Sequence, residues 1–212
     1  MRCTTLYSPL WPAFGQQPVD QTRGKRVATA DAIKNFQAFV HWRLVEFTID
    51  IADCAPVIYS RGAGTVLDAE TARTCILAGA QFIVSPALNL ETIALCRRYS
   101  VAVLPGALTP TEVVQAWTAG ADFVKVFPAG ALGGASYLKA LKAPLPQIEL
   151  VPTGGVSLKT AADFIKAGAS ALGVGADLVD VKALRAGQAS VITERARQYV
   201  EIVREARQAS TQ

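Results

Sequence analysis

The chain has 212 residues, of which 51% are hydrophobic and 18% charged, so it can fold around one large core. This balance excludes a disordered chain, and no apolar run reaches the roughly 20 residues that a membrane span needs, so we expect no membrane partner. The net charge is +4, but the basic residues form no stripe, so we expect no nucleic-acid partner either.

Cysteine and histidine usage indicates a cytoplasmic protein without a metal. The cysteines have no CxxC or metal-binding spacing, which is typical of reduced thiols, and the single histidine, His41, has no second histidine with which to share an ion. Pro9 and Pro12 interrupt the apolar start of the chain, so we interpret residues 1–16 as an irregular terminal extension and not a signal peptide.

The first 60 residues fit a repeating pattern poorly. The only candidate for a first strand, "QPVDQTRG" (17–24), is polar; the helix "ADAIKNFQAFVHWR" (30–43) and the strand "RLVEFTI" (43–49) follow it. Only six residues separate Asp50 from Val57, where the next strand begins. A parallel crossover with its helix usually takes about a dozen residues or more, so we expect the outer helix between strands two and three to be missing or vestigial.

Beyond residue 57 the chain repeats one design. The segments "ILAGAQFIVSP" (76–86), "WTAGADFVKVFP" (117–128) and "IKAGASALGVG" (165–175) each end a helix at Ala-Gly-Ala and continue into an apolar strand. Strands that are apolar on both faces indicate a parallel sheet covered by helices. The pattern predicts strands near 57–65, 81–85, 101–104, 122–127, 148–152 and 170–174. It predicts helices near 68–78, 89–99, 110–119, 135–142, 157–167 and 188–207.

Capping residues support these helix starts. Asp68, Asn89 and Thr109 each precede a predicted helix, and Pro110 takes the first helical position after Thr109. Regular βα units without a linker favour a single domain over residues 1–212 with a (β/α)8 TIM-barrel fold, and an open doubly wound sheet is the alternative.

Lys125 is the unusual residue of the predicted strand "DFVKVFP". An ammonium group among apolar neighbours loses hydration, which disfavours its charged form. A lysine at a strand end can instead extend its charged group to solvent. If Lys125 stays buried, its free amine is available as a nucleophile that forms a Schiff base with a carbonyl substrate.

Two further features accompany Lys125. Glu46 is a second ionisable group in an apolar strand, where it can serve as an ion-pair partner of the lysine or transfer protons. The motifs "TGG" and "GVG" follow the last two strands, where barrels commonly bind phosphate through backbone N–H groups. Tight turns that need glycine are the alternative interpretation.

Taken together, these segments resemble the pyruvate-dependent class I aldolases that cleave 2-keto-3-deoxy-6-phosphogluconate (KDPG) and 4-hydroxy-2-oxoglutarate (KHG). The resemblance runs in order from about residue 43 to 180. It rests on "VEFT", "GAGTVLDAET", "AGAQFIVSP", "LPGALTPTEV", "AGADFVKVFPA", "ASYLKAL", "VPTGGV" and "AGASALGVG".

The resemblance implies a homotrimeric barrel that acts on a small 2-keto acid and needs no metal or cofactor. It implies that Lys125 forms the Schiff base and that Glu46 is the general acid and base. Thr65 and Thr153 would line the pyruvate half of the site, and Pro86 and Phe127 would shape the pocket. The distal phosphate would be held by the glycines at positions Gly154, Gly155, Gly173 and Gly175.

The chain departs from the family pattern at two of these sites. Where many members carry an arginine that binds the pyruvate carboxylate, this chain has Asp50, so Arg23 in "TRG" is assigned that role. Where many members have a serine after "GVG", this chain has Ala176. A phosphate-binding barrel of another reaction class and a non-catalytic barrel with an altered N-terminal part are the alternative hypotheses.

Overall fold

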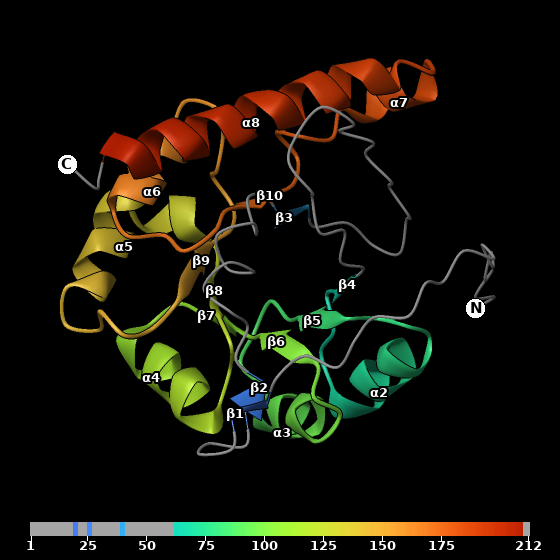
Figure 1. Ribbon diagram of the computed structural model, residues 1–212, viewed down its shortest axis with the longest axis vertical. Coiled ribbons are helices and arrows are strands. Elements are labelled where there is room, and N and C mark those ends of the chain that lie inside the picture. The colour runs from blue at the N-terminus through green and yellow to red at the C-terminus, as the bar shows by residue number, and fades with distance from the viewer. Residues whose placement is uncertain (1–18, 21–24, 27–38, 41–61, 210–212) are drawn as a thin grey trace.

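Short strands alternate with helices in the computed structural model, which describes residues 19–20, 25–26, 39–40 and 62–209. The strands are β1 (Val19–Asp20), β2 (Lys25–Arg26), β3 (Phe39–Val40), β4 (Gly62–Gly64), β5 (Phe82–Val84), β6 (Ala102–Leu104), β7 (Gly106–Ala107), β8 (Val124–Val126), β9 (Leu150–Pro152) and β10 (Gly173–Val174). The helices are α2 (Ala69–Leu77), α3 (Leu90–Arg98), α4 (Pro110–Ala119), the 3-10 helix η1 (Ala129–Leu132), α5 (Ala135–Lys142), α6 (Ala161–Lys166), α7 (Val181–Arg185) and α8 (Ala189–Ala209). Figure 1 shows strands β3 to β10 at the centre and the helices outside them.

The predicted helix ends are confirmed by their capping contacts. Asp68 accepts a hydrogen bond from the Thr71 N–H at 2.6 Å, and Asn89 does the same for Thr92 at 2.8 Å. Thr109 and Glu112 form a reciprocal capping box at the start of α4. At the other end of α4, Gly120 has a φ of 95°, the left-handed conformation that glycine adopts without a Cβ clash.

The sheet is a continuous arc of parallel strands. β4, β5 and β6 pair in that order, as do β7, β8 and β9. Only Pro105 separates β6 from β7, so these two elements are parts of one strand that pairs with β5 on one side and β8 on the other. A bridge between Thr153 and Gly173 joins β9 to β10, which pairs in turn with β3. Closure of this arc into eight strands stays a prediction.

Both faces of the arc are covered, as the apolar strands predict. On the inner face, the buried cluster consists of Val84, Leu104, Val151 and Ala171, with Phe82 and Phe123 packed against it. On the outer face, Val124 and Val126 pack in a larger cluster with side chains of the surrounding helices. In Figure 1, α8 lies along one side of the sheet beside α6. No helix in the described part of the chain is both long and apolar enough to cross a bilayer.

Two predictions in the N-terminal region are wrong. Phe39–Val40 is not helical but forms β3, in parallel register with Gly173–Val174. Phenylalanine and valine favour strands, and pairing with a distant strand outweighs a helical pattern. The candidate first strand is not a parallel barrel strand either, because Val19–Asp20 pairs antiparallel with Lys25–Arg26. Its polar residues suit a hairpin better than burial on both faces.

The sequence did not predict the short helices η1 and α7, and the other departures are small. The predicted helix over 157–167 is helical from Ala161 to Lys166, after a turn in which the Ser157 carbonyl accepts from the Thr160 and Ala161 N–H groups. The final helix, α8, is confirmed. The strand over 43–49 and the short connection after Asp50 lie outside the described residues.

Candidate active site

Lys125 lies at the middle of β8 and is buried, with 2% of its surface exposed. Its register partners on the neighbouring strands are Gly106 and Val151. Val151 belongs to the inner cluster, whereas Val124 and Val126 belong to the outer one, so alternation along the strand directs Lys125 to the inner face. The buried interpretation of this lysine is therefore confirmed.

Burial changes the chemistry of this amine. It lowers the pKa of Lys125 from 10.5 to about 8, because the low-dielectric interior disfavours the ammonium form. The Lys125 Nζ atom lies 4.7 Å from the centroid of the Phe127 ring, and this contact favours the ammonium form of the lysine. Desolvation has the larger effect on its pKa. At pH 7 about one tenth of such an amine is free, which is a few hundred times more than for a solvated lysine.

Gly106 provides the space beside the lysine. A Cβ atom at this position would lie 2.2 Å from the backbone of Pro86, so only glycine lets Pro86 approach this strand. The structure thus brings Pro86 next to the register partner of Lys125, and its role in shaping a pocket stays a prediction. Gly106 itself was not predicted as a site residue. Its position in "LPGALTPTEV", one of the segments that resemble the family, could have indicated it.

Thr153 follows β9 on the inner face and is 7% exposed. Its hydroxyl has no hydrogen-bond partner among the described residues. A Cβ atom on Gly173 would lie 2.1 Å from this hydroxyl oxygen, so the glycine makes room for the threonine. A buried polar group without a partner costs about 1–3 kcal/mol, which a substrate oxygen at this position would offset.

The glycine turn after β9 packs against the segment after β8. Gly154 and Gly155 have φ values of 82° and 78°. The Gly130 N–H donates to the Gly154 carbonyl at 2.9 Å, and a Cβ atom on Gly155 would lie 2.7 Å from the Gly130 Cα. Both glycines are therefore needed for backbone conformation and close packing, and the turn lies at the same end of the sheet as Phe127.

Thr65 follows β4 at the same end of the sheet. It is exposed and has a φ of 61°, which is unfavourable for a β-branched residue. Such strain concentrates at functional sites, where the surrounding structure maintains it. The residue follows a strand that lies three strands away from β8 in the arc, at the end of the sheet that also carries Phe127.

The turn after β10 completes this end of the sheet. The Gly175 carbonyl accepts hydrogen bonds from the Leu178 and Val179 N–H groups, both at 3.0 Å. Ala176 is exposed in this turn. Glu46 and Arg23 lie outside the described residues. Within residues 62–209 and the short strands before them, no group of three metal-ligating side chains comes together.

Comparison with known proteins shows a consistent pattern. A family model described as KDPG and KHG aldolase matches residues 53–195 of the chain. The chain is 37% identical over 151 residues to a 2-dehydro-3-deoxy-phosphogluconate aldolase of Treponema pallidum, and the match covers 71% of each protein. It is 41% identical over 147 residues to a 2-dehydro-3-deoxy-6-phosphogalactonate aldolase of Escherichia coli, covering 68% of this chain and 69% of that protein.

A solved structure supports the same comparison. It is that of a KDPG aldolase from Legionella pneumophila with pyruvate captured at low pH as a covalent carbinolamine intermediate. The two chains superpose with a TM-score of 0.60 at 29% identity, and the match covers 66% of this chain and 67% of that one.

Proposed function

Because this chain belongs to the KDPG and KHG aldolase family, we propose that it is a class I aldolase that uses Lys125 as its Schiff-base residue. Its substrates are 2-keto-3-deoxy-6-phosphogluconate, 4-hydroxy-2-oxoglutarate or both. The products are pyruvate and an aldehyde, which is glyceraldehyde 3-phosphate in the first case and glyoxylate in the second. The observation that carries this proposal is the lysine buried on β8 with a pKa lowered to about 8.

The chemistry follows from that amine. The free amine of Lys125 adds to the C2 ketone to give a carbinolamine, which loses water and becomes a protonated imine. When the C4 hydroxyl gives up its proton, the C3–C4 bond breaks and the aldehyde leaves. The bond electrons remain on the enamine, which the protonated imine stabilises much better than a ketone would. A proton added at C3 and water added at C2 then release pyruvate and the lysine.

Three polar side chains complete the pyruvate half in this proposal. Glu46 transfers the protons, and Arg23 binds the carboxylate in place of the arginine that Asp50 replaces. The buried hydroxyl of Thr153, which lacks a partner among the described residues, supplies a hydrogen bond to a substrate oxygen on the inner face of the sheet. Thr65 borders the same half from β4.

The distal anion binds at the glycine turns in this proposal. Gly154 and Gly155 after β9 and Gly175 after β10 present backbone N–H groups at the end of the sheet that carries Phe127. The contact of Gly173 with the Thr153 hydroxyl indicates that Gly173 contributes mainly by leaving space. Ala176 supplies no hydroxyl, so this chain holds a phosphate with one donor fewer than a serine would provide.

We further propose that the arc closes as an eight-stranded barrel in residues 1–212 and that three copies assemble in the cytoplasm. The family resemblance supports all three statements. Multi-angle light scattering at micromolar concentration tests the assembly, and a monomer alone would contradict it.

The decisive experiment is reductive trapping. The folded protein is treated with pyruvate and borohydride, and its mass is measured intact and after proteolysis. We expect one covalent adduct, on Lys125, because an exposed lysine with a pKa near 10.4 forms imines slowly at neutral pH. Cleavage of the 2-keto-3-deoxy-6-phospho sugar acids (gluconate and galactonate forms) and of 4-hydroxy-2-oxoglutarate is then measured from the amount of pyruvate released.

Two outcomes would count against the proposal. The absence of an adduct on a folded sample would rule out Schiff-base chemistry and favour a phosphate-binding barrel of another class or a non-catalytic one. An adduct on a different lysine would show that Lys125 is not the Schiff-base residue. Glu46→Gln is expected to slow cleavage severely while still allowing slow trapping, since the amine remains.

A further inference from the structure

Asp177 lies immediately after the glycine turn of β10, two residues beyond Gly175. A carboxylate at this place would repel an anion bound to the turn. The structure directs it elsewhere, because the Tyr199 hydroxyl donates to the Asp177 Oδ2 atom at 2.5 Å. The backbone of the same residue is also held, because the Arg195 Nη1 atom donates to the Asp177 carbonyl at 2.7 Å.

Both contacts come from one face of α8. Arg195 and Tyr199 are four residues apart, so they lie on the same face of this helix, and both contact Asp177. Tyr199 is completely buried, and burial together with the Asp177 carboxylate raises the pKa of its hydroxyl, which therefore remains a donor. A buried hydroxyl bonded to a carboxylate makes a stronger contact than a neutral pair.

The turn itself is rigidly built. Leu178 and Val179, whose N–H groups bond to the Gly175 carbonyl, are both buried in the core beneath it. A shift of the turn is therefore opposed by this core packing and by the contacts of Asp177 with α8. Tyr199 and Arg195 supply the contacts from α8, and both act on the turn through Asp177.

We propose that Tyr199 and Arg195 are positioning residues that fix the turn after β10 and hold the Asp177 carboxylate away from the distal anion of the substrate. This inference rests on the distal-anion part of the proposed function. It explains how a turn that lacks a serine at position 176 can accept a phosphate next to an acidic residue.

The first test is a split between substrates. In Tyr199→Phe we expect KM for the phosphorylated substrate to rise about ten-fold, because a charge-assisted hydrogen bond is lost and the carboxylate is freed. We expect kcat, and both constants for 4-hydroxy-2-oxoglutarate, to stay within about two-fold, because that substrate has no phosphate. In the double variant Tyr199→Phe/Asp177→Asn, KM for the phosphorylated substrate should return most of the way to the wild-type value, because the side chain released at position 177 is neutral.

Matched variants separate positioning from general damage to α8. Arg207 also joins this helix to the sheet, but it donates to the Ser170 carbonyl at 2.7 Å, at the opposite end of β10. Arg207→Met should lower the melting temperature and leave the ratio of the two KM values unchanged. Arg195→Met should raise KM for the phosphorylated substrate, and Arg195→Lys should restore part of the loss. Circular dichroism checks that each variant is folded.

The outcomes are distinguishable from failure of the proposed function. If the wild type cleaves both substrates but Tyr199→Phe affects them equally or affects neither, the positioning inference is wrong and the aldolase stands. The same holds if Arg207→Met reproduces the split. If the wild type cleaves neither substrate, the aldolase proposal fails. The positioning inference is then tested by titrating the protein with inorganic phosphate and measuring binding by phosphorus NMR. Weaker phosphate binding by Tyr199→Phe than by wild type supports it, and equal or absent binding overturns it.

Discussion

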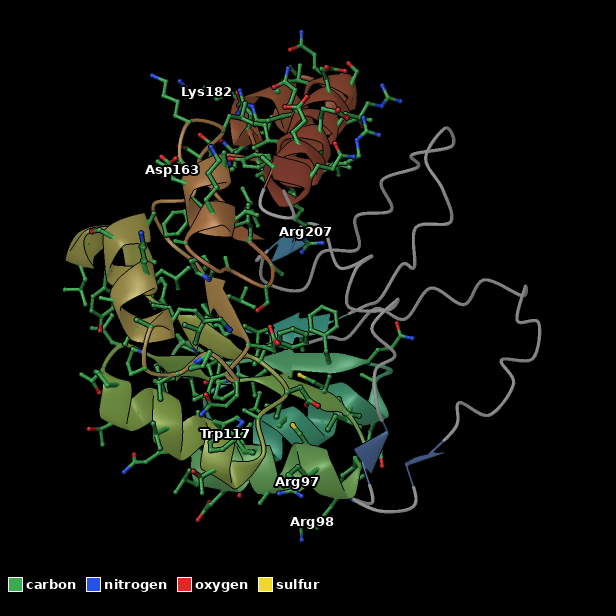
Figure 2. All side chains as sticks on the ribbon, turned by 60° about the vertical axis from the view of Figure 1, so that its left-hand side comes forward. Arg97, Arg98, Trp117, Asp163, Lys182 and Arg207 are labelled. Atoms are coloured by element: carbon green, nitrogen blue, oxygen red, sulfur yellow. The ribbon has the colours of Figure 1, made fainter. Side chains whose placement is uncertain are left out.

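The two ends of the parallel strands are built differently. At the amino-terminal ends, the polar groups are paired: the Ser170 hydroxyl donates to Glu149, the Lys142 ammonium donates to the Ile148 carbonyl at 2.6 Å, and the Asp122 carboxylate accepts from the Val103 N–H at 2.9 Å. Arg207, which extends from α8 toward the strands in Figure 2, donates to the Ser170 carbonyl.

The carboxyl-terminal ends have unfavourable features instead. A lysine is buried among apolar residues, a threonine hydroxyl lacks a partner among the described residues, and Thr65 has a left-handed backbone. Each feature lowers stability, and the Lys125 amine and the Thr153 hydroxyl are the groups that the proposed substrate would contact. The comparison teaches that the two ends differ in how their polar groups are satisfied, and the proposed site lies at the carboxyl-terminal ends, where barrels carry their chemistry. Variants at the two ends should therefore have opposite effects.

The largest effect should come from Lys125→Arg. We expect this change to abolish the pyruvate adduct and to lower kcat by about 10⁴-fold or more, because a guanidinium group is not an amine nucleophile. The matched control is Lys142→Arg at the amino-terminal end, where the side chain only donates to a backbone carbonyl. Stopped-flow assay of pyruvate release measures both, and a Lys125→Arg enzyme with normal kcat would contradict the assignment.

Lys125→Met should separate stability from activity. Removing an amine whose pKa is lowered from 10.5 to about 8 should raise the free energy of unfolding by about 3 kcal/mol at pH 7, while activity is lost. The unfolded chain keeps its proton up to pH 10.5, so between pH 8 and 10.5 the wild type gains stability as pH rises. Urea titrations at pH 7 and pH 9.5 should show the gap between the two proteins narrowing, and a constant gap would contradict this.

Ser170→Ala should have the opposite signature at the amino-terminal end. It removes the donor to the Glu149 carboxylate, so the free energy of unfolding should fall by about 1–2 kcal/mol. We expect kcat and KM to stay unchanged, because this end of the sheet lies away from the site. A change in KM would show that the two ends are coupled.

Thr65→Asn should have the smallest effect on stability. Asparagine tolerates the left-handed conformation better than threonine, so we expect a gain of about 0.5–1 kcal/mol in unfolding free energy and a measurable loss of kcat/KM. Ser100 has a φ of 55° and precedes β6 at the amino-terminal end, so Ser100→Asn is the matched control. It should stabilise the protein by a similar amount without affecting cleavage, and an equal loss of activity in both variants would remove the distinction.

Local patterns made most of the fold between Gly62 and Ala209 predictable. The capping residues Asp68, Asn89 and Thr109 act within one helical turn, so their role can be read from a few neighbouring positions. Lys125 differs, because a lysine at a strand end can also extend its charged group to solvent, and the structure decided that this one is buried. The N-terminal predictions for Phe39–Val40 and Val19–Asp20 were wrong. The first pair of residues forms a strand with a partner that is distant in the sequence, and the second pairs antiparallel in a hairpin, and neither partner is marked in the local pattern.

From Gly62 onward, the sequence by itself thus determined the order of the strands and of the helices other than η1 and α7, and the end of the sheet where the glycine turns lie. These properties follow from hydrophobic periodicity and from turn residues that act over short distances. Only the tertiary structure decided that Gly173 makes room for the Thr153 hydroxyl and that Tyr199 bonds to Asp177. Each of these contacts joins residues about 20 positions apart whose side chains carry no mark of one another, so they exist only once the strands and α8 have packed.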